Sequence, residues 1–150
     1  MPTSEMSLPV ATGARGHRTI EHTADAGIEA WGPTLADAYE ESAAGLFELM
    51  LDPATIDERE SRRIRVTGDD DGDLLVRWLT ELLFFVDAEA LVFRRLVVER
   101  MSPHELVATG YGERLDPARH LLRTAVKAAT YHELRVDAGP PARVRVLLDI

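Results

Sequence analysis

The chain contains no cysteine. This absence excludes disulfide bonds and thiolate metal sites, and it leads us to expect a cytoplasmic protein. No run of apolar residues approaches the length of a membrane-spanning helix. A glycine-rich phosphate loop, a Ser-His-Asp or Cys-His pattern and a His-Glu-x-x-His motif are also missing from the sequence. The usual signatures of nucleotide hydrolysis, covalent catalysis and zinc proteolysis therefore do not apply.

Basic residues are few, with 17 Lys and Arg against 26 Asp and Glu and a net charge of −9 at pH 7. An acidic surface repels phosphate backbones, so we expect no direct binding to nucleic acid. Arg62, Arg63 and Arg65 mark the place where a basic patch would be sought. The charge suits a partner protein with a basic surface, although solubility alone would also account for it.

The 150 residues fit one domain, long enough to bury a core. Residues 1–17 are rich in Pro, Thr, Ser and Gly and lack the apolar core of a signal peptide. We predict that residues 1–17 form a disordered N-terminal tail and that residues 18–150 form the folded domain.

Two long helices are predicted. Thr34-x-x-Asp37 resembles a capping box, and apolar residues at steps of three and four follow it over 35–51. The acidic run at 69–73 lacks the spaced acids and closing Glu of an EF-hand calcium loop. It is therefore interpreted as the start of a helix, where the helix dipole favours negative charge. A wide apolar stripe over 74–86 then predicts the most buried helix, with Trp78 in the core.

Strands are predicted from alternation and turn signals, and a short helix after Asp116-Pro117. The strand segments begin at Ile20 and cover 28–31, 64–66, 91–100, 105–112, 127–136 and 144–150. The order of elements predicts an α+β fold: a two-layer sandwich with a mixed, mainly antiparallel sheet packed by two long helices.

Acidic groups stand near both ends of this domain. Asp25 follows the first strand, and Asp149 and the α-carboxylate of Ile150 lie side by side at the other end. If the first and last strands are neighbours, the three carboxylates converge and repel one another unless a hard cation relieves them. Oxygen ligands favour calcium, magnesium or manganese over zinc. Alternatively, Asp25 belongs to an ordinary turn and Asp149 is solvated.

Other polar residues near these acids have two interpretations each. His22 could bind metal or phosphate, or hold the turn through a hydrogen bond. Thr23 could contact a phosphate or cap the turn, and Lys127 could steady a phosphate or stay solvated. Alternation places His132 on an apolar face and predicts a core histidine, while His120 stays ambiguous. The remaining two histidines, His17 and His104, are assigned to the tail and to a turn.

Four motifs in order resemble the archease family over about residues 18 to 150. The motifs are His22-Thr23-Ala24-Asp25 with Gly27 and Trp31-Gly32, Tyr111-Gly112-Glu113 with Asp116-Pro117 and His120, Val126 to His132, and Leu148-Asp149-Ile150. Ala26 stands where a larger aliphatic residue is expected. The resemblance implies a protein cofactor, not itself an enzyme, of the GTP-dependent tRNA-splicing RNA ligase, which promotes ligase guanylylation and multiple turnover in tRNA splicing or RNA repair.

The resemblance also implies site residues. Metal binding falls on Asp25, Asp149 and Ile150, with calcium expected first and magnesium or manganese as alternatives. His22, Thr23 and Lys127 would form a rim that acts on the partner. Two other functions remain open: a chaperone-like specificity factor for a tRNA-modifying enzyme, and a stand-alone metal-dependent hydrolase built from Asp25, Asp149 and His22.

Overall fold

The structure is a computed structural model that describes residues 13–22 and 24–150. Its elements follow in the order β1 (Gly16–Glu21), β2 (Asp25–Gly32), α1 (Leu35–Met50), the 3-10 helix η1 (Pro53–Thr55), β3 (Glu60–Thr67), α2 (Asp71–Glu89), β4 (Leu91–Met101), β5 (Glu105–Arg114), α3 (Pro117–His120), β6 (Ala128–Ala129), β7 (Arg135–Asp137) and β8 (Ala142–Asp149). Helices and strands both contribute widely, which confirms the predicted α+β class.

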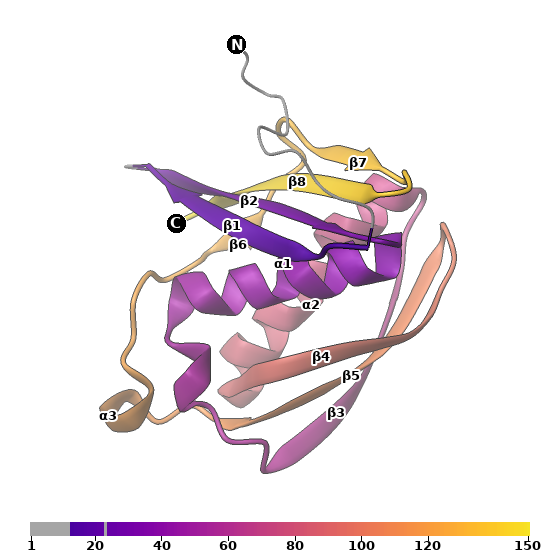
Figure 1. The fold of residues 1–150 in the computed structure, drawn as a ribbon. Coiled ribbons are helices and arrows are strands. Elements are labelled where there is room, and N and C mark those ends of the chain that lie inside the picture. Colours follow the sequence, from indigo (N-terminus) through magenta and orange to yellow (C-terminus); the bar gives the residue numbers. More distant parts are fainter. Residues whose placement is uncertain (1–12, 23) are drawn as a thin grey trace.

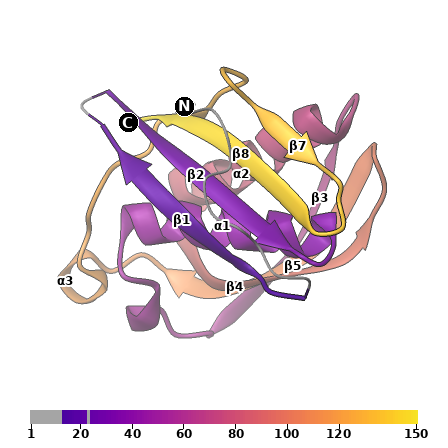
Figure 2. The same cartoon turned by 45° about the horizontal axis from the view of Figure 1, so that its top comes forward.

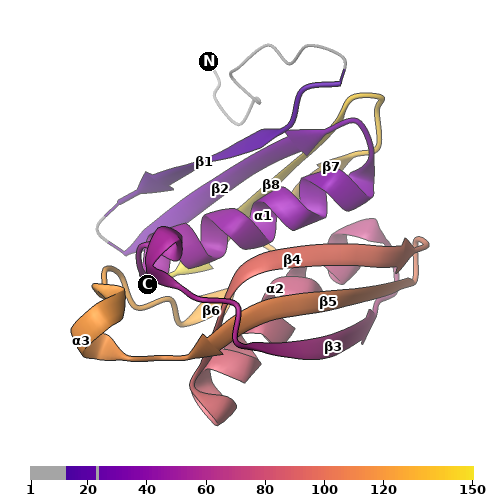
Figure 3. The ribbon, with the colours of Figure 1, turned by 60° about the horizontal axis from the view of Figure 1, so that its bottom comes forward.

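The strands form two sheets. One has the order β1-β2-β8-β6, with β7 also paired to β8, and the other has the order β3-β5-β4. Every pairing is antiparallel. Helix α1 lies between the sheets and contacts strands of both, and α2 packs beside it (Figure 1; Figure 3). The prediction of one mixed sheet was wrong on this point, because alternation shows that a segment is a strand but not which strand it pairs with.

Both long helices begin where their caps were predicted. The Thr34 hydroxyl accepts a hydrogen bond from the Asp37 N–H at 3.2 Å, and an Asp37 carboxylate oxygen accepts one from the Thr34 N–H at 3.1 Å. In α2 the Asp70 carboxylate accepts from the Asp73 N–H at 2.8 Å. Trp78 is fully buried and its indole N–H donates to the Tyr39 carbonyl of α1. The helix caps and the core position of Trp78 are confirmed.

The hairpin of β4 and β5 and the short helix α3 also lie where they were predicted. The Asp116 carboxylate caps α3 by accepting from the Ala118 N–H at 3.1 Å. In β8, Val144, Val146 and Leu148 are fully buried, as their alternation indicated, while Asp149 is exposed. No helix in the described part of the chain is long and apolar enough to cross a membrane.

The strand predicted over 127–136 is wrong. Only Ala128–Ala129 and Arg135–Asp137 are strands, and a turn between them closes with the Leu134 N–H donating to the Tyr131 carbonyl at 3.3 Å. Glu133 takes a positive φ of 52° in this turn, a conformation that alternation of residue types does not reveal.

At the other end of the domain, β1 already begins at Gly16, two residues before the predicted boundary at 18. His17 is therefore part of a strand and not of the tail. Its Nδ1 bonds the Glu41 carboxylate and its Nε2 the Glu48 carboxylate, each at 2.9 Å, which ties β1 to α1. Residues 1–12 lie outside the described residues, so the disorder of the tail stays a prediction.

Candidate metal centre and its surroundings

The two predicted aspartates meet at one end of the larger sheet. Strand β8 pairs with β2 in a register that places Asp149 directly opposite Asp25, and this end of both strands is visible beside the C-terminus in Figure 2. Residues opposite each other in an antiparallel pair share a face, with Cβ atoms about 5 Å apart. The neighbouring pair, Ala26 and Leu148, is fully buried, so the aspartates lie on the sheet's outer face.

Main-chain hydrogen bonds bring two more predicted residues to the same end. The Ile150 N–H donates to the Ala24 carbonyl at 3.5 Å, and the Lys127 N–H donates to the Asp149 carbonyl at 2.8 Å. Lys127 is the only lysine in the sequence, and its side chain is exposed. Sequence positions 25, 127, 149 and 150 thus lie together, and we call them the acidic end.

His22 joins this group from the β1–β2 turn. Its N–H donates to the Asp25 carbonyl at 2.8 Å, and its Nδ1 lies 3.2 Å from an Asp25 carboxylate oxygen. The His22 side chain is 72% exposed, so it remains accessible to a ligand while it orients Asp25. Thr23 lies outside the described residues.

The donors suit a hard cation. Two carboxylates on one face of adjacent strands provide oxygen ligands, and like charges so close together are destabilising without a counter-ion. Among residues 13–22 and 24–150, no three His, Cys, Asp or Glu side chains form a metal-binding cluster. Two aspartates would therefore need further oxygen atoms, which the Ile150 carboxylate, water or a partner can supply.

The space beside the acidic end is small. A recess of about 40 Å³ lies on the same face, lined by Ile20, His22, Gly27, Glu29, Arg145 and Leu147. That volume is close to the share of liquid occupied by one water molecule, about 30 Å³. An organic substrate does not fit there. Among the described residues, the acidic end is therefore an open surface with paired carboxylates and no enclosed substrate cavity.

Glu113 and His120, which belong to the second of the motifs, are part of a buried network of ion pairs and hydrogen bonds. His120 is fully buried; its Nδ1 accepts from the Asp116 N–H at 2.8 Å, so Nε2 carries the proton and donates to the Glu113 carboxylate at 2.9 Å. Arg119 pairs with Glu113 at 2.7 Å, and the Asp57 N–H donates to Glu113 at 2.6 Å. These partners, Arg119 foremost, lower the pKa of Glu113 from 4.5 to about 2.

The network settles the open question of His120. Both of its ring nitrogens are bonded, so it holds α3 in place and has no free atom for catalysis or metal binding. His132, predicted to be a core histidine, is instead exposed in the turn after β6, because the strand expected there does not form. His104 lies in the β4–β5 turn as predicted.

Sequence reasoning missed the segment 121–126, which connects α3 to the acidic end. The Thr124 hydroxyl donates to the Glu21 carboxylate at 3.1 Å, next to His22. The segment also lines an apolar cavity of about 210 Å³, which is described below. Its one visible signal in the sequence is the apolar pair Leu121-Leu122, placed directly after a short helix.

Comparison with known proteins agrees with the shared motifs. The model of the Archease protein family (MTH1598/TM1083) matches residues 17–150. Protein archease of Sulfurisphaera tokodaii is 40% identical over 79% of this chain and 86% of its own length. Protein archease of Methanothermobacter thermautotrophicus is 35% identical over 91% of this chain and 99% of its own.

A solved structure shares the fold as well. The solution structure of Methanobacterium thermoautotrophicum protein 1598 superimposes with a TM-score of 0.72 at 32% identity, covering 90% of this chain and 99% of that one. Sequence and structure therefore lead to the same result, and this chain belongs to the archease family.

Proposed function

We propose that this chain is a metal-binding protein cofactor, not itself an enzyme, that activates the GTP-dependent tRNA-splicing RNA ligase by promoting its guanylylation and multiple turnover. The observation that carries the proposal is the pairing of Asp25 with Asp149 across β2 and β8, with Ile150 and Lys127 held beside them. A bound divalent cation would supply positive charge for a nucleotide phosphate or for the partner's own metal site.

The shape of the acidic end favours action on a partner over independent catalysis. Asp149, Lys127 and His22 are exposed, and the adjacent recess holds about one water molecule. A hydrolase would need a cavity that encloses its substrate next to the metal. An exposed rim can instead enter the cleft of another protein, with Asp25 and Asp149 holding the cation and Lys127 presenting a charge to phosphate.

The charge distribution favours a protein partner over direct RNA binding. The arginines of the basic cluster considered in the sequence are all engaged: Arg62 pairs with Glu60 and Glu89, Arg63 with Glu99, and Arg65 with Glu105. Neutralised in this way, they offer little attraction to a phosphate backbone. The net charge of −9 suits the basic face of an RNA-binding enzyme.

The metal site is tested by thermal unfolding of chelator-treated protein with and without calcium, magnesium or manganese. At a cation concentration about 100-fold above Kd the native chain should gain about 2.7 kcal/mol, or a Tm higher by about 5–10 °C. Asp25→Asn and Asp149→Asn should each lose most of that gain. Asp69→Asn makes the same charge change at an exposed position elsewhere and should keep it.

The role is tested by ligase guanylylation with the same variants. Native protein and Asp69→Asn should accelerate guanylylation, whereas Asp149→Asn and a chain extended beyond Ile150 should not, because the extension moves the carboxylate out of the site. Metal binding that stays intact in both aspartate variants would rule out the site. Improved solubility of the ligase without faster guanylylation would favour a chaperone, and turnover without the ligase would favour a hydrolase.

A further inference from the structure

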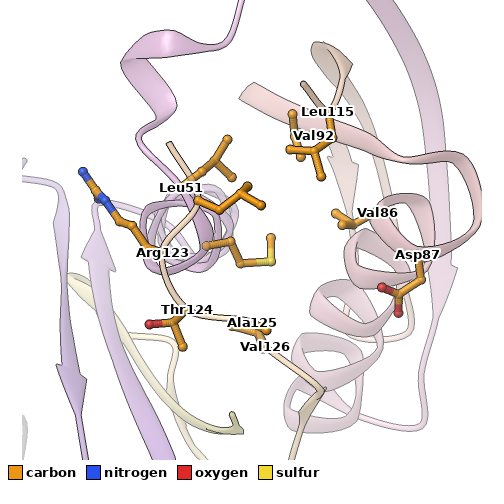
Figure 4. A pocket seen from close by; sticks show the side chains of 11 residues that line it. Leu51, Val86, Asp87, Val92, Leu115, Arg123, Thr124, Ala125 and Val126 are labelled. Atoms are coloured by element: carbon orange, nitrogen blue, oxygen red, sulfur yellow. The ribbon is translucent and has the colours of Figure 1, made fainter. Parts of the chain in front are cut away.

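An apolar cavity of about 210 Å³ opens between the C-terminal ends of α1 and α2. Figure 4 shows Val86, Val92 and Leu115 on one side of it, facing Leu51 on the other. Its lining consists of Met50, Leu51, Val86, Asp87, Val92, Leu115, Leu122, Arg123, Thr124, Ala125 and Val126. The space is large enough for one aliphatic or aromatic side chain.

The cavity is fixed by the main chain of the segment 121–126. The Arg123 N–H donates to the Met50 carbonyl at 2.8 Å and the Thr124 N–H to the Leu49 carbonyl at 3.0 Å, which satisfies the free carbonyls at the end of α1. The Arg123 guanidinium turns away and donates to the Glu48 carbonyl. The walls are therefore formed before any ligand arrives, which lowers the entropic cost of binding.

The mouth of the cavity exposes apolar surface and the Asp87 carboxylate, while the Arg123 guanidinium turns away to the Glu48 carbonyl. Leu122 lines the cavity yet is 54% exposed, and Phe84, also exposed, lies one helical turn from Asp87. The Asp87 carboxylate is exposed and has no ion pair or hydrogen bond from any residue in 13–22 or 24–150. An apolar hole with a lone carboxylate at its edge is complementary to an apolar side chain flanked by Lys or Arg.

The cavity and the acidic end share one piece of chain. Val126 lines the cavity, and the next residue, Lys127, donates its N–H to the Asp149 carbonyl. Thr124, also in the lining, bonds Glu21 at the base of the β1–β2 turn. A protein that covers the acidic end is therefore within reach of the cavity.

We infer that this cavity is a docking site for the partner protein, and this inference rests on the proposed function. The cavity receives an aliphatic or aromatic side chain of the partner protein. A neighbouring Lys or Arg of the partner pairs with Asp87. The anchor supplies affinity and orientation, while the acidic end supplies the activating cation. Docking and activation then depend on different residues.

Affinity of the full chain for the ligase protein, measured by titration calorimetry, tests the anchor. Leu122→Gln should weaken binding at least about tenfold, which corresponds to about 1.4 kcal/mol. Leu121→Gln is the matched control, since Leu121 is 62% exposed against 54% for Leu122 but does not line the cavity. Asp87→Arg should weaken binding through charge repulsion, and Asp69→Arg should change it much less.

The variants must keep the cation-induced rise in Tm, which shows that the fold and the acidic end are intact. Equal affinities of Leu122→Gln and Leu121→Gln would overturn the inference, even if Asp149→Asn still abolished activation. A native chain that does not bind the ligase would overturn both proposals. Self-association of the native chain that Leu122→Gln abolishes would assign the cavity to a second copy and likewise overturn the inference.

Discussion

Glu113 is a buried carboxylate on which the Arg119 and Arg59 guanidinium groups, the Asp57 N–H and His120 converge. Glu113→Gln should destabilise the fold in a pH-dependent way. Ionisation of a carboxyl whose pKa falls from 4.5 to about 2 on folding stabilises the protein by about 3 kcal/mol. The Arg119 guanidinium is 41% exposed and partly screened by water, so we expect about 2 kcal/mol. For a chain of this size that loss lowers Tm by about 4–8 °C.

The pH dependence follows from the lowered pKa. Because the folded-state pKa of Glu113 lies below the unfolded value, its stabilisation is complete above the unfolded pKa of 4.5 and disappears as pH falls through about 2. The difference in unfolding free energy between native and Glu113→Gln proteins should therefore be largest near neutral pH and shrink toward about pH 2.

Urea unfolding followed by far-UV circular dichroism at a series of pH values measures this difference. Glu99→Gln is a suitable control, because Glu99 is exposed and its ion pair with Arg63 is long, at 3.6 Å; its effect should be small. A Glu113→Gln deficit that stays constant across the acid range, or that matches Glu99→Gln, would refute the network's proposed electrostatics.

Two further substitutions test the packing of the helices and strands. The hydrogen bond to Glu41 raises the pKa of His17 in the folded state, so the stability lost in His17→Gln should be largest below the ordinary histidine pKa of 6.5 and should fall as pH rises. Urea unfolding at several pH values measures this loss. A loss of stability that grows with pH would contradict the prediction. Gly112→Ala should prevent normal folding, since its Cβ would lie 1.8 Å from the Val92 carbonyl oxygen, whereas the Cβ of Gly27→Ala meets only an ordinary contact at 3.4 Å. Soluble yield and Tm are measured for both variants. A stable Gly112→Ala protein would show that the β4–β5 contact can open.

Features set by neighbouring residues could be predicted from the sequence. The Thr34 and Asp37 capping box, the Asp70 cap of α2 and the Asp116 cap of α3 depend on side chains two or three positions apart, so their signals are local. The alternation of β8 likewise predicted which side chains are buried and that Asp149 faces outward.

Local patterns failed where a turn replaced a strand. Over 127–136 the alternation of residue types is compatible with a strand, yet only its two ends pair with β8. The same error misplaced His132, while His120 could not be assigned because its partner Glu113 and the main chain around it come together only through α3. Burial of a polar residue depends on the partners the fold supplies.

For the candidate site too, the sequence identified the residues, and the tertiary structure decided which of them lie together. The sequence alone identified Asp25, Asp149, Ile150, His22 and Lys127 as residues of interest, and their meeting was conditional on the last strand lying beside the first ones. Only the tertiary structure decided that β8 pairs with β2 and places the two aspartates opposite each other. It also decided that the strands form two sheets, and that the ends of α1 and α2 form an apolar cavity together with the segment 121–126. Helix caps and alternation are fixed by residues close in the chain, whereas strand partners and cavities depend on packing between distant segments, which no local pattern specifies.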